Sequence, residues 1–124
     1  MAHILIADDD PVQLDLRKSF LESQEHEVSI ALSVRQTVRF LEARTPDLVI
    51  LDLRFPNAVG ESDSGEGLAL IRRIRDVNGR IPILVLSGWP ADLDGHPEEK
   101  LVTRVLLKPV KSGELMQAVQ ELIA

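Results

Sequence analysis

The chain has 124 residues, a net charge of −6 and no cysteine, and 44% of its residues are hydrophobic. This size suits one domain with a buried core, which we expect to span residues 1–124, and the lack of cysteine and of a signal-peptide pattern predicts a cytoplasmic protein without disulfides or thiolate chemistry. No apolar run reaches the ~18 residues of a spanning helix, and an acidic chain with 3% aromatics argues against a membrane or direct nucleic-acid partner for this domain.

Short apolar runs alternate with amphipathic helical patterns along the whole chain. The pattern predicts strands at residues 3–7, 27–32, 47–53, 81–86 and 103–107, and helices at 11–24, after Ser33, at 67–77 and at 111–123. Residues 90–100 are ambiguous because Pro90, Gly95 and Pro97 interrupt a helical pattern.

The helix starts carry recognisable caps. Asp10 precedes Pro11, which is typical of an N-cap followed by a first-turn proline, and Ser33 with Gln36 three residues later indicates a capping box. Apolar residues then recur along each helix. The rows are Val12, Leu16 and Phe20 on the first helix, Val34, Val38 and Leu41 on the second, Leu68, Ile71 and Ile74 on the third, and Leu115, Val119 and Leu122 on the last.

The third predicted strand contains an unbroken Leu-Val-Ile-Leu run at residues 48–51. A continuous apolar run indicates burial on both faces, as in a parallel sheet. Alternation of five strands with helical segments then predicts an α/β protein. Its five-stranded parallel sheet is expected to be covered by helices on both faces. We take its strand order to be 2-1-3-4-5, one of the common orders of doubly wound sheets.

Polar side chains that could bind a ligand or take part in a reaction follow four of the five predicted strands. In an open α/β sheet, ligands bind outside the carboxyl ends of the strands at the switch point, here between strands one and three. The residues concerned are Asp8, Asp9 and Asp10 after the first strand, Asp52 on the third, Ser87 on the fourth and Lys108 on the fifth.

Carboxylates that converge at one place need a counter-ion. Two unit charges about 4 Å apart cost roughly 4 kcal/mol at an effective dielectric near 20. Ligands that offer only oxygen select a hard cation, and a small set of carboxylates suits Mg²⁺ better than Ca²⁺. One carboxylate could then attack phosphorus to form an aspartyl phosphate, with Lys108 and the Ser87 hydroxyl binding phosphoryl oxygens.

Four segments resemble the motifs of response-regulator receiver (CheY-like) domains of two-component signal transduction. They are Ile4 to Pro11, Leu51 to Pro56, Leu86 to Gly88 and Leu107 to Pro109, in family order across the chain. The resemblance implies a flavodoxin-like (βα)5 three-layer sandwich. It also implies that the bond between Lys108 and Pro109 is cis.

The resemblance further implies a role for each motif residue. Asp52 would be the phosphoacceptor, and the phosphoryl group would come from a histidine kinase or histidine phosphotransfer protein. The signal would pass to a downstream protein or output domain. The domain would catalyse its own phosphorylation and dephosphorylation, but it would not be an enzyme with an external substrate. Mg²⁺ would be bound by Asp52, by Asp9 directly, by Asp8 mostly through water and by the backbone carbonyl of Arg54. The phosphoryl group would be bound by Ser87, Gly88, Leu53 and Lys108.

Three features depart from the family pattern. Val105 stands where the family usually has an aromatic switch residue. Either Gly60 or Gly67 could be the family glycine after the phosphoacceptor; the helical pattern matches best from Gly67, which makes residues 58–66 an insertion. Residues 90–100 lack the family's fourth-helix pattern, so we expect that helix to be short, displaced or mobile.

Several residues have a simpler interpretation beside the functional one. Asp10 is expected to be only an N-cap, and the acidic residues of the loop after Asp52 (Glu61, Asp63 and Glu66) to be solvated rather than to form a lid. Trp89 could cover the site and slow water entry, or could be a partly buried packing residue. His3, His26 and His96 show no ligand spacing and are expected at the surface or an edge.

Two other functions compete with a phosphorylation switch. Val105 and the irregular segment at residues 90–100 favour a phosphorylation-independent (pseudo-receiver-like) interaction module. A metal-dependent phosphatase with an aspartyl intermediate would need a second aspartate two residues after Asp52, where the chain has Arg54.

Overall fold

The structure is a computed structural model, which describes residues 2–123. Its centre is a five-stranded parallel sheet in the order β2-β1-β3-β6-β7. The strands are β1 (His3–Ala7), β2 (Glu27–Ala31), β3 (Leu48–Asp52), β6 (Ile83–Ser87) and β7 (Arg104–Leu107). The predicted strands and their order are confirmed, with ends that move by at most two residues.

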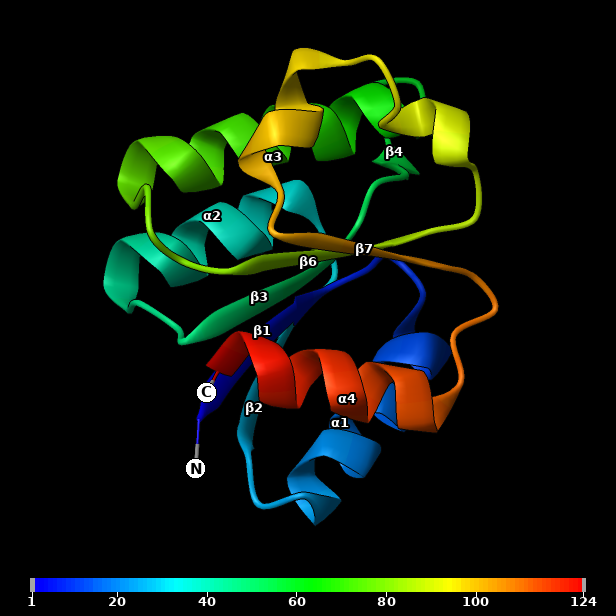
Figure 1. The fold of residues 1–124 in the computed structure, drawn as a ribbon. Helices are drawn as coiled ribbons and strands as arrows, with labels where there is room; N and C mark the ends of the chain where they lie inside the picture. Colours follow the sequence, from blue (N-terminus) through cyan, green and yellow to red (C-terminus); the bar gives the residue numbers. More distant parts are fainter. Residues whose placement is uncertain (1, 124) are drawn as a thin grey trace.

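Four α-helices cover the sheet in two layers (Figure 1). They are α1 (Pro11–Ser23), α2 (Val34–Ala43), α3 (Ser64–Val77) and α4 (Ser112–Ile123). Helices α2 and α3 lie on one face, and α1 and α4 lie on the other. The predicted flavodoxin-like three-layer α/β sandwich is therefore confirmed. No helix among residues 2–123 is long and apolar enough to cross a membrane.

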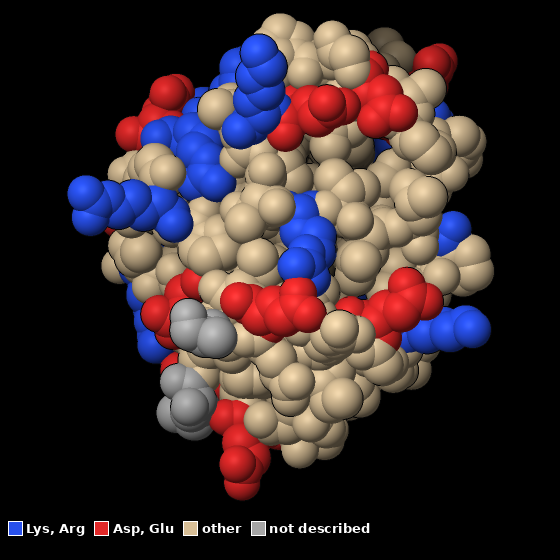
Figure 2. All heavy atoms as spheres, viewed as in Figure 1, with Lys and Arg blue, Asp and Glu red and all other residues tan. Residues whose placement is uncertain are grey.

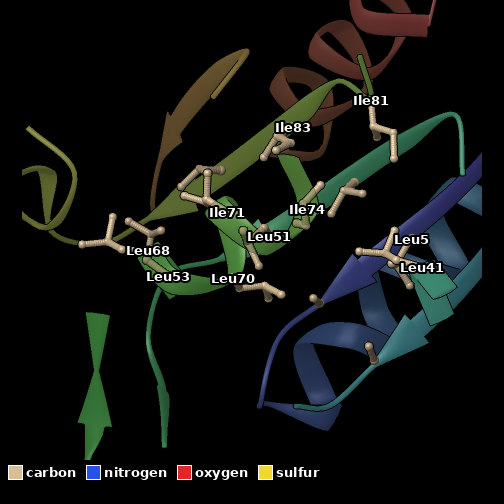
Figure 3. Close-up of a cluster of buried hydrophobic side chains, with 14 of the residues drawn as sticks. Leu5, Leu41, Leu51, Leu53, Leu68, Leu70, Ile71, Ile74, Ile81 and Ile83 are labelled. Atoms are coloured by element: carbon tan, nitrogen blue, oxygen red, sulfur yellow. The ribbon is translucent and has the colours of Figure 1, made fainter. Parts of the chain in front are cut away.

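The core has two halves, one on each face of the sheet. The half between the sheet and helices α2 and α3 is built around Leu51 and Ile83 from the strands and Leu70, Ile71 and Ile74 from α3 (Figure 3). The opposite half takes alternate residues of the same strands, including Ile4, Ile6 and Ile50, and packs them against α1 and α4. Burial on both faces explains why β3 reads as an unbroken apolar run.

Helix α1 turns a different face to the core than its apolar row predicts. Val12 and Leu16 are 64% and 61% exposed, whereas Leu14 and Leu21 are fully buried, so the row of Val12 and Leu16 does not mark the inner face of the helix. Leu14 and Leu21 are two helical turns apart and therefore share one face. Phe20 is only partly buried at the edge of the same core.

The capping predictions hold at both helix starts. Asp10 Oδ1 accepts a hydrogen bond from the Val12 amide at 3.0 Å, so its N-cap role is confirmed. Ser33 Oγ accepts from the Gln36 amide at 3.1 Å, and Gln36 Oε1 accepts from the Leu32 amide at 2.7 Å. The box therefore closes on the residue before the cap rather than on the cap itself.

The segment after Asp52 is more ordered than a loop. Strands β4 (Phe55–Pro56) and β5 (Ser62–Asp63) pair as an antiparallel hairpin, and α3 begins at Ser64 instead of residue 67. Asp63 explains the earlier start, because its Oδ1 accepts from the Gly65 amide at 2.8 Å and caps the helix. Residues 58–66 thus supply the hairpin tip, strand β5 and the start of α3.

Gly67, not Gly60, is the glycine that the packing demands. A Cβ atom on Gly67 would lie 2.1 Å from the carbonyl oxygen of Leu53 and 2.4 Å from its Cα. Gly60 has φ +83° at the hairpin tip, and a Cβ there would meet nothing within 4 Å. The close approach of α3 to the residue after Asp52 therefore depends on Gly67.

Residues 90–101 form two 3₁₀ helices, η1 (Pro90–Asp92) and η2 (Pro97–Leu101), in place of the family's fourth α-helix. We call them the η1–η2 segment. We expected a helix that is short, displaced or mobile, and the structure has two short 3₁₀ helices here. Arg72 of α3 pairs with the buried Glu98, and Arg75 donates to the Leu101 carbonyl at 3.0 Å, which holds the segment against α3.

His3 is not at the surface. It is 6% exposed, its Nε2 lies 2.9 Å from Ser29 Oγ, and its ring centroid is 5.2 Å from that of Phe40. The expectation of a surface or edge position is wrong for His3, because β1 is an inner strand and even its first residue has neighbours on both sides.

Candidate functional site

Three carboxylates meet at the carboxyl ends of β1 and β3. Asp8 and Asp9 directly follow β1, and Asp52 is the last residue of β3. Because these strands are neighbours in the sheet, one oxygen from each of the three side chains lies within 4.8 Å of the other two. The sheet order therefore builds the acidic cluster that the sequence predicts at the switch point.

Asp8 is the most constrained member of the cluster. Its side chain is 2% exposed, Arg17 Nη1 donates to its Oδ2 at 2.9 Å, and the amide of Asp10 donates to its Oδ1 at 3.0 Å. The carboxylate is thus fixed in place by a cation from α1 and by the turn that follows β1. Asp10 itself faces away into its capping role.

Asp9 is affected both by partial burial and by the neighbouring carboxylates. Partial desolvation, followed by the neighbouring charge of Asp8 and with a smaller contribution from Asp52, raises the pKa of the Asp9 carboxyl. An oxygen-only cluster of this kind suits a hard divalent cation. Asp8, Asp9 and Asp52 thus fit Mg²⁺ by their chemistry and spacing.

Lys108 is brought to the cluster from the end of β7. Its Nζ lies 2.9 Å from Asp52 Oδ2, and its own amide donates to the Ser87 carbonyl at 2.8 Å. The Lys108–Pro109 bond is cis, in agreement with the resemblance. The cation partly compensates Asp52 while leaving the carboxylate at the mouth of the site, with 12% of its side chain exposed.

Ser87 ends β6 next to Asp52. Its side chain is buried, its Oγ donates to the Trp89 carbonyl at 3.0 Å, and the same Oγ accepts from the Trp89 amide at 3.2 Å. The space around Gly88 is open, since a Cβ there would meet nothing within 4 Å. The side chain of Leu53 is buried in the core, so only its backbone can face the site.

The side chain of Arg54 has a role that the sequence did not reveal. Its backbone amide donates to Asp52 Oδ1 at 3.3 Å, while its Nε and Nη2 donate to the two carboxylate oxygens of Asp92 at 2.8 and 3.1 Å. Its guanidinium carbon lies 3.7 Å from the centroid of the Trp89 ring. The Asp92 carboxylate, with further help from the charges of Asp52 and Asp63, raises the pKa of Arg54.

Trp89 is 55% exposed and packs on this guanidinium rather than in the core. The acidic loop residues contribute differently from one another: Asp63 caps α3, while Glu61 is exposed on the hairpin. The pairing of Trp89 with Arg54 lies beside the site, because the Arg54 amide donates to Asp52. No sequence signal marks it, because the partners lie 35 and 38 residues from Arg54 along the chain.

Comparison with known proteins agrees with this geometry. The family model for the response regulator receiver domain matches residues 4–120. This chain belongs to the response regulator receiver domain family. The structure of a response regulator receiver domain protein from Clostridium thermocellum superposes with a TM-score of 0.84 at 27% identity, covering 99% of this chain and 94% of that one. The response regulator TrrA from Thermotoga maritima, solved in complex with Mg²⁺ and BeF, has the same fold, with a TM-score of 0.85 at 24% identity and coverage of 98% and 99%.

Two relatives among curated proteins are much longer than this chain. The transcriptional regulatory protein GlrR of Escherichia coli is 32% identical over 121 residues, which is 97% of this chain but 26% of GlrR. The virulence transcriptional regulatory protein PhoP of Salmonella typhimurium is 29% identical over 128 residues, or 99% of this chain and 52% of PhoP. The chain therefore spans about a quarter to a half of the length of these relatives.

Proposed function

We propose that this receiver domain is a phosphorylation switch in which Asp52 accepts a phosphoryl group from a histidine kinase or histidine phosphotransfer protein. The observation that carries the proposal is the convergence of Asp8, Asp9 and Asp52 within 4.8 Å, with Lys108 Nζ 2.9 Å from Asp52. Membership of the receiver family adds support, because the acidic cluster and the lysine lie on family motifs.

The residues of the site would share the work as follows. Mg²⁺ would be held by Asp8, Asp9, Asp52 and the backbone carbonyl of Arg54, and it would neutralise charge on the phosphoryl oxygens. The Mg²⁺ and BeF complex of TrrA supports a site of this type in the fold. Because Asp8 is fixed by Arg17, the cation would be positioned before the donor arrives.

Phosphoryl transfer then needs a nucleophile that attacks phosphorus and groups that stabilise the negative charge on the phosphoryl oxygens. An Asp52 carboxylate oxygen attacks phosphorus, the new O–P bond forms as the N–P bond to the donor imidazole breaks, and the electron pair returns to the ring nitrogen. Lys108 pairs with a phosphoryl oxygen once Asp52 carries the phosphoryl group. The Ser87 hydroxyl and the backbone amides of Leu53 and Gly88 donate to the remaining oxygens. Hydrolysis by water would regenerate the carboxylate and release inorganic phosphate.

The phosphorylated form would bind a downstream protein or output domain differently from the free form. The relatives named as transcriptional regulators support an output beyond the receiver. This domain would act in the cytoplasm without touching nucleic acid itself, in keeping with its net charge of −6.

A phosphorylation-independent interaction module is the second candidate. It is favoured by Val105, which is 38% exposed where the family has an aromatic, and by the 3₁₀ helices of the η1–η2 segment. The phosphatase hypothesis is weaker, because the guanidinium of Arg54, bound to Asp92, replaces the second acid–base carboxylate.

Amide hydrogen exchange distinguishes the first two candidates. We expect acetyl phosphate with Mg²⁺ to change protection in segments away from Asp52 in the wild type, and to change nothing in Asp52→Asn or when EDTA replaces Mg²⁺. Asp94→Asn, an exposed substitution with the same change of charge, is the matched control and should respond like the wild type. Identical exchange with and without the donor would contradict the switch and favour constitutive docking.

A further inference from the structure

The hydroxyl of Ser87 is already occupied. Its hydrogen is donated to the Trp89 carbonyl, and its oxygen accepts from the Trp89 amide. A hydroxyl has only one hydrogen to donate. If Ser87 donates to a phosphoryl oxygen on Asp52, it must therefore release the carbonyl of Trp89.

Trp89 is in turn tied to Arg54 and Asp92, because its carbonyl also accepts a hydrogen bond from the Asp92 amide at 3.0 Å and its ring contacts Arg54. The guanidinium of Arg54 lies over its ring at 3.7 Å, and the same guanidinium makes two hydrogen bonds to Asp92. We call Arg54, Trp89 and Asp92 the Arg54 latch. It joins the residues that follow Asp52 to the first turn of the η1–η2 segment.

The charge of the site also acts on the Arg54 latch. Arg54 is two residues from Asp52, and the negative charges that act on its guanidinium come from Asp92, Asp52 and Asp63. A phosphoryl group on Asp52 adds negative charge to the site. The electrostatic attraction of Arg54 toward the site, and away from Asp92, therefore becomes stronger. The same event therefore disturbs the latch at both ends, through Ser87 and through Arg54.

The molecule has room for the movement that this implies. A cavity of about 210 Å³ lies between β7 and the η1–η2 segment, with Ser87, Pro90, Leu93 and Val105 in its lining. The small side chain of Val105 leaves this space open. Acidic side chains gather over this part of the molecule in Figure 2, and the exposed Asp94 belongs to the segment. A shift of η1 would thus rearrange an exposed, charged surface.

We propose that the Arg54 latch carries the state of Asp52 to the η1–η2 segment, in place of an aromatic switch at position 105. Arg54, Trp89 and Asp92 are positioning residues in this scheme: they hold η1 in its resting place, and occupation of the phosphoryl site opens them. The inference rests on the proposed function, since it needs a phosphoryl group, or its analogue, at Asp52.

Trp89 is the only tryptophan, so its emission reports the latch directly. The probe is beryllium fluoride with Mg²⁺, and binding is followed independently by the fluorine NMR signal of the bound ion. We expect the wild type to change its Trp89 emission in parallel with binding. The matched control Asp76→Asn makes the same change of charge at an exposed position on α3. Asp76 makes no hydrogen bond or ion pair with Arg54 among the described residues, so this variant should behave like the wild type.

Opening the latch in advance should alter both readouts. In Asp92→Asn, the emission before ligand should already resemble that of liganded wild type, and beryllium fluoride should bind at least about fivefold more tightly because no latch has to be opened. Arg54→Lys, which keeps a cation but cannot make the two-pronged contact, should shift both readouts in the same direction.

The outcomes separate a failure of the Arg54 latch from a failure of the proposed function. Wild-type binding without an emission change, or Asp92→Asn binding with wild-type affinity, would overturn the latch and leave the proposed function standing. Absence of any bound fluoride in the wild type with Mg²⁺ would overturn the proposed function and the latch together.

Discussion

Gly67→Ala is a substitution whose effect follows directly from the packing of α3. An alanine Cβ at this position would lie 2.1 Å from the Leu53 carbonyl oxygen and 2.4 Å from the Leu53 Cα. Both atoms belong to the backbone, so no rotamer change can relieve the overlap. Either α3 or the segment after Asp52 must move by roughly 1 Å.

The magnitude comes from two opposing effects. Overpacking that forces side chains and backbone to shift costs about 1–3 kcal/mol and occasionally more, and an overlap with backbone atoms belongs at or above the top of that range. Alanine in a helix interior is about 1 kcal/mol more favourable than glycine. We therefore expect Gly67→Ala to lower the free energy of unfolding by about 2 kcal/mol or more, a large share of a typical 5–15 kcal/mol.

Urea unfolding followed by circular dichroism measures this effect. Gly113→Ala is the matched control, because Gly113 also lies in a helix but a Cβ there meets nothing within 4 Å. That variant should be neutral or stabilised by up to about 1 kcal/mol. If Gly67→Ala were as stable as Gly113→Ala, the close approach of α3 to Leu53 would be refuted.

Two further predictions concern charged residues. Lys108→Ala removes the cation 2.9 Å from Asp52. Calorimetry should therefore show that the acidic cluster binds Mg²⁺ about fivefold more tightly, which is equivalent to about 1 kcal/mol. Weaker binding of Mg²⁺ would contradict the assigned charge balance. Glu98 is buried and its pKa is lowered, first by a hydrogen bond from its own backbone amide and then by an arginine of α3. Its ionised form therefore adds stability above the ordinary glutamate pKa, and this contribution is lost as pH falls through the lowered value. Glu98→Gln should unfold at lower urea than the wild type at neutral pH, with a gap that closes in acid, while exposed Glu99→Gln should show no gap.

The sheet and the acidic cluster were predictable because each rests on a strong local pattern. An unbroken apolar run marks β3, and parallel strands place their carboxyl ends together, so Asp8, Asp9 and Asp52 had to converge once the strand order was known. Lys108 follows the same logic at the end of β7. Position along the chain was enough in these cases, because the backbone decides where the residue lies.

The features that were missed depend on which neighbour covers a side chain. The apolar row of Val12 and Leu16 does not reveal that Leu14 faces the sheet, and His3 looks like a terminal polar residue until β1 is known to be an inner strand. Arg54 was expected to act only through its backbone carbonyl. Its side-chain contacts come from residues distant in sequence, which no local pattern encodes.

The most direct test of the central claim is the intact mass of the protein after incubation with acetyl phosphate. We predict a gain of one phosphoryl group in the wild type with Mg²⁺, and none when EDTA replaces Mg²⁺ or when Asp52→Asn replaces the wild type. A gain that persists in Asp52→Asn, or none in the wild type with Mg²⁺ bound, would contradict the assignment of Asp52 as the phosphoacceptor.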